Sequence, residues 1–163
     1  GQGTVALEIA QDLPDLDALF APVGGGGLVA GCAALLGQMR PGLTLSGVQA
    51  ARYASMAQAL AGEAVSVEGG PTLADGIAVA QPGAMALDML ARRGVPVLTA
   101  TEAQIGEAVA FLAREAKLVA EGAGAIGLVP LLADPGRFAG RRVAVVVSGG
   151  NIGAQALALA MGG

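Results

Sequence analysis

The chain has 163 residues and a net charge of −4, which is enough for one domain with its own core and too short for two ordinary domains. Hydrophobic residues make up 54% of it, charged residues 13% and aromatic residues 2%, so Ala, Val, Leu and Ile must build the core. With 27 glycines, this mixture favours helices packed closely on a parallel sheet that is buried on both faces. The longest basic runs are two arginine pairs, so we expect a small-molecule ligand and no nucleic-acid partner.

The sequence contains one cysteine, Cys32, and no histidine. A lone cysteine cannot form an internal disulfide, and in an apolar helix it acts as a small buried residue. Without histidine or a Cys/His cluster, no zinc site is predicted. No basic segment followed by an apolar segment opens the chain, so no secretory signal is visible. Together with the absence of disulfides, this favours the cytoplasm.

Two uncharged apolar segments, 18–39 and 143–163, are each about as long as the ~20 residues that span a bilayer. Pro22 and four glycines interrupt the first, and the string SGGN at 148–151 interrupts the second. Such a break in lipid would leave backbone groups unpaired, at a cost of several kcal/mol each. We therefore interpret each segment as a buried strand, a turn and a helix, and expect no membrane span.

The first of these segments contains the turn Gly24–Gly27, between an apolar strand around Leu19 and a helix that ends before Pro41. Glycines at this junction permit positive φ angles and let a ligand approach the backbone amides. The N–H groups and the positive end of the helix dipole then suit a phosphate. The tetrad matches neither the dinucleotide fingerprint nor the P-loop, so a plain tight turn stays open as an alternative.

The remaining elements follow from turn residues and hydrophobic spacing. Thr4 is expected to N-cap a helix running to about Asp12, and Thr101 with Gln104 forms a capping box that begins another. Further helices are expected at 53–60, 84–93, 122–133 and 152–161. Strands are expected at 44–49, 95–100 and 141–147, with a brief extended piece at 118–121 and a loop at 63–71.

This alternation of strands and helices predicts an α/β fold, a three-layer open parallel sheet with helices on both faces, in a single domain over residues 1–163. Ligands of such sheets bind beyond the carboxyl ends of the strands. The strand at 141–147 leads there into Ser148, Gly149, Gly150 and Asn151. We therefore expect this turn and Gly24–Gly27 to lie at the ligand site.

A family resemblance rests on five strings taken in order. PVGGGGLVAG (22–31), LSGVQA (45–50), TLADGIAVAQPG (72–83), KLVAEGAGAIGL (117–128) and VVVSGGN (145–151) resemble serine/threonine dehydratases. These are pyridoxal-phosphate enzymes of the fold shared with the tryptophan synthase β subunit. The opening GQGTVALEI resembles the part of their chain immediately before this region. The resemblance covers nearly the whole chain and implies the Rossmann-like, C-terminal half of that fold.

The resemblance implies a role for several residues. Gly24, Gly25, Gly26 and Gly27 match the loop that cradles the cofactor phosphate, and Ser148 matches the residue whose hydroxyl meets the pyridine nitrogen. A neutral hydroxyl there favours β-elimination over transamination. Asn151 is expected to orient the turn. Glu121 matches a carboxylate near the cofactor, although an ordinary acid at a helix start explains it as well.

Two departures from the family limit what is carried over. Many members have Glu-Pro where this chain has Gln49-Ala50, so no metal site is expected. The family's Schiff-base lysine lies in an N-terminal region without a counterpart here. Lys117 is the single lysine, and we expect it to be a surface residue. No catalytic residue is therefore assigned.

The leading hypothesis is the cofactor-holding C-terminal portion of an ammonia-lyase that converts a small hydroxy amino acid to a 2-oxo acid and ammonia. Alone, the chain is expected to be inactive, and to associate with its missing N-terminal half or with copies of itself. A non-catalytic scaffold derived from such an enzyme stays open as the alternative, and racemases and β-replacing synthases share the motifs. An unrelated nucleotide-binding domain is disfavoured because Gln49, and no acid, ends the second strand.

Overall fold

The computed structural model describes residues 1–162 and contains one sheet of four parallel strands. The order of the strands across the sheet is β3-β2-β1-β4. The strands are β1 (Ala18–Pro22), β2 (Thr44–Ala50), β3 (Val97–Ala100) and β4 (Val143–Val145). The two central strands pair over most of their length, with Ala18 opposite Thr44 and Pro22 opposite Val48.

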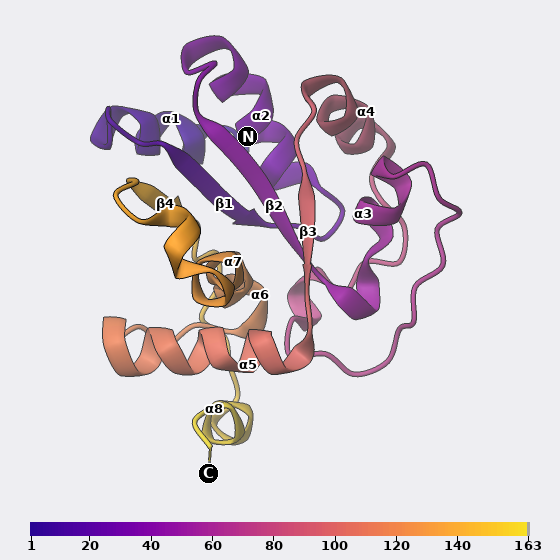
Figure 1. Ribbon diagram of the computed structural model, residues 1–163. Coiled ribbons are helices and arrows are strands. Elements are labelled where there is room, and N and C mark those ends of the chain that lie inside the picture. The colour runs from indigo at the N-terminus through magenta and orange to yellow at the C-terminus, as the bar shows by residue number, and fades with distance from the viewer. Residues whose placement is uncertain (163) are drawn as a thin grey trace.

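Eight α-helices accompany the sheet among the described residues (Figure 1). They are α1 (Thr4–Asp12), α2 (Gly27–Met39), α3 (Ser55–Leu60), α4 (Ala84–Arg93), α5 (Glu102–Phe111), α6 (Gly122–Ala125), α7 (Val129–Ala133) and α8 (Ala154–Ala160). Short 3-10 helices occur at Ala51–Tyr53, Asp75–Ile77, Ile126–Leu128 and Pro135–Phe138, and a π-helical segment, η3 (Leu112–Ala116), extends α5.

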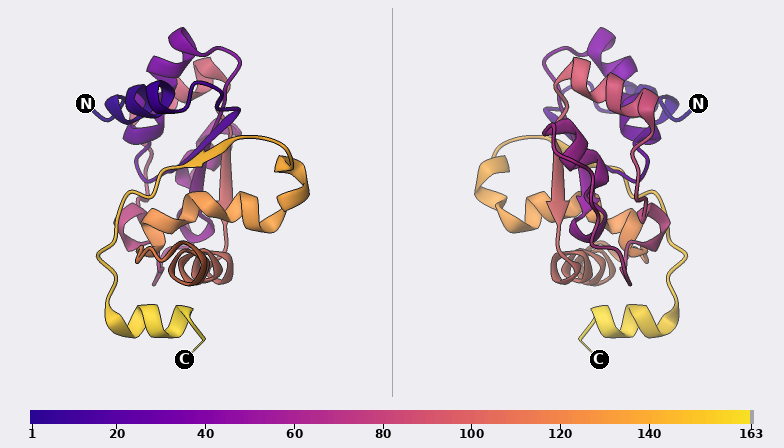
Figure 2. Two further views of the ribbon diagram at one scale, coloured as in Figure 1. Left: turned by 90° about the vertical axis from the view of Figure 1, so that its left-hand side faces the viewer. Right: turned by 90° about the vertical axis from the view of Figure 1, so that its right-hand side faces the viewer.

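The two faces of the sheet bury alternate side chains of β1, because successive residues of a strand point to opposite sides. Leu19 and Ala21 pack against α1, α2 and α4, whereas Ala18 and Phe20 pack against α5, α6 and α7. Figure 1 shows these two helix layers on opposite sides of the sheet, and both views of Figure 2 place α8 beyond α5. The predicted three-layer α/β architecture is confirmed.

The path of the chain reverses once within the sheet. From β1 it moves outward through β2 to β3, and it then crosses the other face through α5, α6 and α7. It returns as β4, which lies against the opposite side of β1, with Phe20 opposite Val145. The point where the strand order reverses therefore lies between β1 and β4, the position where open parallel sheets bind ligands.

Most expected elements are found, and two helix starts illustrate the physical reasons. The Thr101 hydroxyl accepts the N–H of Gln104, whose side chain accepts the N–H of Thr101, so the capping box of α5 is confirmed. Gly94 ends α4 in the left-handed conformation with φ 60°, which glycine adopts at low cost. The predicted cap at Thr4 is wrong, because Gly3 is the N-cap and the Thr4 hydroxyl donates to the Gly1 carbonyl.

Other boundaries differ from expectation near the C-terminal part of the sheet. Residues 118–121 are irregular and pair with no strand, although they were expected to be extended. The strand expected at 141–147 is confined to Val143–Val145, where it pairs with β1 on one side only. The helical run expected at 122–133 is divided into α6, a 3-10 turn and α7, with Pro130 near the start of the last.

No helix within residues 1–162 is both long and apolar enough to cross a membrane. The apolar segment 18–39 forms β1, the glycine turn and α2, as predicted. The second segment forms β4, a turn and α8, and its last residue, Gly163, lies outside the described residues.

Candidate functional site

The glycine turn begins where β1 ends and continues into α2. The Val23 N–H donates to the Val48 carbonyl at 2.8 Å, which holds the end of β1 against β2. Gly26 is the N-cap of α2 and has a φ of 92°, in the left-handed region. A Cβ at Gly26 would lie 2.9 Å from the Cβ of Ala86. Conformation and packing therefore both require glycine at this position.

The other glycines of the tetrad differ in their surroundings. A Cβ at Gly24 would lie 3.2 Å from the Cα of Ile77, so this residue is packed tightly. A Cβ at Gly25 would have no heavy atom within 4 Å, and one at Gly27 would reach only Gln2, at 4.0 Å. Two of the four glycines thus border open space.

Backbone donors accompany that open space. The first i→i−4 bond of α2 runs from the Ala30 N–H to the Gly26 carbonyl at 2.9 Å, so the N–H groups of residues 27–29 precede it. These donors lie at the positive end of a 13-residue helix. A small anion placed beside Gly25 and Gly27 would meet donors and no Cβ, as the phosphate hypothesis requires.

Gln49 supports this turn from the carboxyl end of β2, and its role was not foreseen from the sequence. Its side chain is fully buried. Its Nε2 donates to the Gly24 carbonyl and to the Ser55 hydroxyl, both at 3.4 Å. Its Oε1 accepts the N–H groups of Met56 and Ala57 at the start of α3, at 3.1 and 3.3 Å. A polar residue near the carboxyl end of a mostly buried strand was the sequence signal for this network.

The second turn follows β4, the neighbour of β1. The Val146 N–H donates to the Phe20 carbonyl at 2.9 Å, after which the chain leaves the sheet. Ser148 is exposed, and within residues 1–162 its hydroxyl has no hydrogen-bond partner in the protein. Asn151 takes part through its backbone, because its N–H donates to Glu121 Oε2 at 3.0 Å. The Ser148 hydroxyl is thus available to a ligand.

Glu121 precedes α6, the position expected of a helix-start acid, but its carboxylate makes no capping bond to that helix. The side chain instead lies against the turn after β4, where its Oε2 accepts the Asn151 N–H. Its backbone N–H donates to the Gly149 carbonyl at 3.1 Å. The structure therefore brings Glu121 against the turn that contains Ser148, and its proximity to a cofactor stays a prediction.

An open hollow of about 470 Å³ lies beside this second turn. It is lined by Leu118, Val119, Val147, Ser148, Gly149 and Gly150. Apolar walls next to a free hydroxyl suit a flat aromatic ring that carries one polar atom. Because β1 and β4 are adjacent and parallel, this hollow and the glycine turn lie at the same edge of the sheet, on the two sides of the reversal point.

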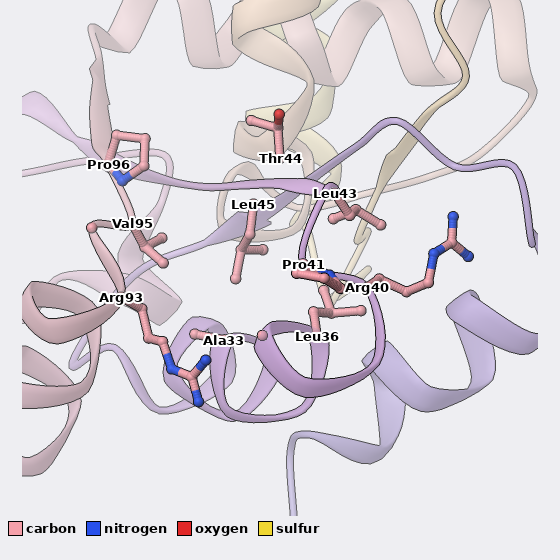
Figure 3. Close-up of a pocket in the computed structure, with 12 residues that line it drawn as sticks. Ala33, Leu36, Arg40, Pro41, Leu43, Thr44, Leu45, Arg93, Val95 and Pro96 are labelled. Carbon is pink, nitrogen blue, oxygen red and sulfur yellow. The ribbon is translucent and has the colours of Figure 1, made fainter.

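A separate hollow of about 370 Å³ lies at the opposite, amino-terminal end of β2 and β3 (Figure 3). Apolar side chains form most of its wall, and Arg40 and Arg93 border it. Arg93 lies over Gly37, where a Cβ would be 2.7 Å from the Arg93 Cζ, and Arg40 donates to the Leu16 carbonyl at 3.3 Å. Both arginines stand at the C-terminal ends of helices, where positive charge stabilises the helix dipole. Packing and the helix dipoles therefore account for the two arginines at this hollow, and no ligand is needed to explain them.

Neither a cluster of metal ligands nor a buried lysine is found in the part of the chain that the structure describes. Within residues 1–162, no three His, Cys, Asp or Glu side chains are grouped so that they could hold a metal ion. Lys117 is exposed, as predicted, and follows η3 with a φ of 57°. Its ammonium group donates to the Arg114 carbonyl.

A glycine turn and a hydroxyl-bearing turn thus lie on either side of the reversal point of a parallel sheet, which defines an open α/β domain of the kind that binds ligands at this position. The sequence profile of the family described as "Pyridoxal-phosphate dependent enzyme" matches residues 1–149. The chain belongs to this family.

Individual relatives agree with this assignment. L-threonine ammonia-lyase of Thermotoga maritima is 44% identical to the chain over 153 residues, which is 93% of this chain and 38% of the relative. The processed form of threonine deaminase isoform 2 from Solanum lycopersicum matches 99% of the chain with a TM-score of 0.89 at 29% identity. Maize serine racemase matches 98% with a TM-score of 0.85 at 26% identity.

These matches are partial with respect to the relatives. The chain spans 38% of the length of the Thermotoga protein, 48% of the tomato protein and 50% of the maize protein. The fold and family thus extend over nearly all of this chain, while more than half of the Thermotoga protein has no counterpart in it.

Proposed function

We propose that this chain is the cofactor-holding, C-terminal portion of an ammonia-lyase that removes water and ammonia from serine or threonine to give a 2-oxo acid. The observation that carries the proposal is the position of two turns, Gly24–Gly27 and the turn at Ser148, on either side of the reversal point of the sheet. The expected cofactor is pyridoxal 5′-phosphate, and the threonine ammonia-lyase and deaminase among the relatives support the lyase reaction.

The phosphate group would be held at the glycine turn. Gly25 and Gly27 border open space beside the first N–H groups of α2, so an anion can approach these donors without meeting a Cβ. Gly26 and Gly24 keep the turn in shape through conformation and packing. The arrangement binds phosphate through backbone donors and a helix terminus, and no basic side chain is needed.

The pyridine ring would lie in the hollow beside Leu118 and Val119, with its nitrogen at the Ser148 hydroxyl. When bound, the cofactor supplies an electron-withdrawing ring that stabilises negative charge at the substrate Cα. The neutral hydroxyl of Ser148 would donate a hydrogen bond to the ring nitrogen and would not protonate it. This weakens the ring as an electron sink and favours elimination, in which the leaving group takes the electrons.

Lys117 is not suited to abstract the α-proton in this proposal. It is exposed and its ammonium group is bound to the Arg114 carbonyl, so the basic lysine of the complete enzyme would come from outside this chain. This observation also favours the second candidate function, a non-catalytic scaffold descended from such an enzyme. Measurement of turnover separates these two candidate functions.

The partner we propose is the N-terminal half of the enzyme, with self-association as the alternative when that half is absent. β4 is an edge strand whose residues are only half-buried, and Val119, beside the turn that follows it, is 59% exposed. Exposed apolar side chains next to an unpaired strand edge favour association. A cytoplasmic location stays a prediction from the sequence.

Ligand binding at the glycine turn tests the proposal directly. Inorganic phosphate should shift the amide NMR signals of Gly24–Gly27, and pyridoxal phosphate should in addition shift those around Ser148. Without the covalent bond to a lysine, we expect a dissociation constant on the order of millimolar, or about −4 kcal/mol. Unchanged glycine amides at tens of millimolar phosphate in a folded sample would mean that the glycines serve packing alone.

The matched variants for this test are Gly25→Val and Gly42→Val. A Cβ at either position meets nothing within 4 Å, so both chains should fold, but only the first places a side chain where the anion binds. We expect Gly25→Val to abolish the response to phosphate and Gly42→Val to keep it. Substitution of Gly26 is unsuitable, because its positive φ and its contact with Ala86 would confuse unfolding with loss of binding.

A further inference from the structure

The turn after β4 is held in place mainly by one residue. The Glu121 N–H donates to the Gly149 carbonyl at 3.1 Å, and its Oε2 accepts the Asn151 N–H at 3.0 Å. Between the Val146 N–H at the end of β4 and the first bond of α8, the described residues contain no other hydrogen bond to this turn. Glu121 therefore spans the turn with its main chain at one end and its side chain at the other.

Close packing accompanies these bonds. A Cβ at Gly149 would lie 2.7 Å from the Glu121 Cδ, and a Cβ at Gly124 would lie 2.8 Å from the Gly149 nitrogen. The carboxylate of Glu121 also lies beside Gly76, where a Cβ would be 3.3 Å from its Oε1. The absence of side chains at these three glycines lets the carboxylate and the turn approach each other this closely.

We propose that Glu121 is a positioning residue that sets the place of the Ser148 hydroxyl through this turn, and that it does so as a hydrogen-bond acceptor and not through its charge. The inference rests on the proposed function, in which the Ser148 hydroxyl bonds to the pyridine nitrogen of the cofactor. In the sequence, Ser148 lies between Val146, which is bonded to β1, and Gly149, which is bonded to Glu121. No other hydrogen bond within residues 1–162 fixes this part of the turn. A shift of the turn by about 1 Å would carry the hydroxyl out of hydrogen-bond range.

The competing explanation is electrostatic. A carboxylate before a helix interacts favourably with the positive end of its dipole, and a charge near a bound ring would alter the properties of that ring. However, α6 has only 4 residues, and the carboxylate makes no capping bond to it. The acceptor role and the charge role predict opposite results for two conservative substitutions.

Glu121→Gln keeps an oxygen acceptor at the same distance along the side chain and removes the charge. Glu121→Asp keeps the charge and withdraws the acceptor from the Asn151 N–H by one methylene. If Glu121 acts by position, Gln should preserve the turn and Asp should release it. Glu115→Gln and Glu115→Asp are the matched controls, because Glu115 is exposed on η3 and makes no side-chain hydrogen bond among residues 1–162.

The first measurement needs no ligand. In the unmodified chain and in Glu121→Gln, the Asn151 amide should be protected from hydrogen exchange, and in Glu121→Asp this protection should be lost. The second measurement compares inorganic phosphate with pyridoxine 5′-phosphate, which has the ring nitrogen but no aldehyde to react with lysine. The preference for pyridoxine 5′-phosphate over phosphate should fall roughly fivefold in Glu121→Asp, as expected for one lost hydrogen bond, and be kept in Glu121→Gln.

Two results would overturn the inference: retained amide protection and ligand preference in Glu121→Asp, or loss of both in Glu121→Gln. Phosphate affinity alone should be equal in all variants, because the glycine turn is built from other elements. If phosphate fails to bind even the unmodified chain, the proposed function fails, while amide exchange at Asn151 still decides whether Glu121 holds the turn.

Discussion

Cys32 lies in α2 close to the glycine turn, with none of its surface exposed. Burial raises the pKa of its thiol from 9.0 to about 11, and a backbone hydrogen bond opposes this to a smaller extent. Because only the thiolate attacks disulfide reagents, two pKa units reduce its reactivity about a hundredfold. We therefore predict that an aromatic disulfide reagent at about pH 8 labels the folded chain at least about a hundredfold more slowly than the denatured chain.

The same shift predicts a pH dependence of stability. The thiol ionises more readily in the unfolded chain, so Cys32 favours folding below pH 9, and this contribution is lost as the pH rises from 9.0 to about 11. Denaturant titrations of the unmodified chain and of Cys32→Ala should therefore converge over this range. Fast labelling of a folded sample, or parallel stability curves for the two chains, would contradict the burial of this thiol.

At the scale of elements, Gln49 joins β2, the glycine turn and the start of α3 through four hydrogen bonds. Gln49→Leu has a similar volume but leaves buried partners unpaired in the glycine turn and at the start of α3. We expect a loss of about 2–4 kcal/mol in the free energy of unfolding, because each unsatisfied buried group costs about 1–3 kcal/mol. Thermal unfolding should shift downward by roughly 5–15 °C for a chain of this size.

Gln58→Leu provides the matched control for this network. Gln58 makes two hydrogen bonds to Ser66, at an exposed site in the loop after α3. Its loss should cost no more than about 1 kcal/mol. Equal destabilisation by the two substitutions would mean that the buried network around Gln49 contributes nothing special to the glycine turn.

At the scale of the whole molecule, the proposal requires a second part of the enzyme for turnover. With added pyridoxal phosphate, the 163-residue chain should release no 2-oxo acid from L-serine or L-threonine above the rate of free cofactor. The physical reason is that no lysine within residues 1–162 is placed to move the α-proton, Lys117 being exposed and bound to the Arg114 carbonyl. A colorimetric assay for 2-oxo acids, with the Thermotoga L-threonine ammonia-lyase as positive control, measures this.

Lys117→Ala is the decisive variant for that assay. If the unmodified chain turned over substrate and this variant did not, Lys117 would be the catalytic base and its assignment to the surface would be wrong. Turnover above the rate of free cofactor that survives the substitution would instead mean that another group of the chain moves the α-proton.

The order of strands and helices was predictable because local residues carry it. Glycine and proline residues mark helix ends, and apolar runs of strand length alternate with segments in which apolar residues have helical spacing. The capping box at Thr101 begins α5, as predicted from the sequence. The boundaries that failed lie where pairing decides the outcome. The run RRVAVVV has the composition of a strand of seven residues, but an edge strand keeps only the part that pairs with β1, which is Val143–Val145.

Some features of the candidate site were likewise predictable from the sequence, and others were not. Gly24–Gly27 and Ser148 were recognisable from the chain alone, because glycines before a helix and a hydroxyl after a strand carry local chemistry. The unequal roles of Gly25 and Gly26 could not be predicted from the sequence. They depend on which residues pack against each glycine: Ala86, distant in the sequence, lies against Gly26, whereas nothing lies against Gly25. Likewise, the four bonds of Gln49 and the hold of Glu121 on Asn151 arise from residues brought together only by packing, so they became visible only in three dimensions.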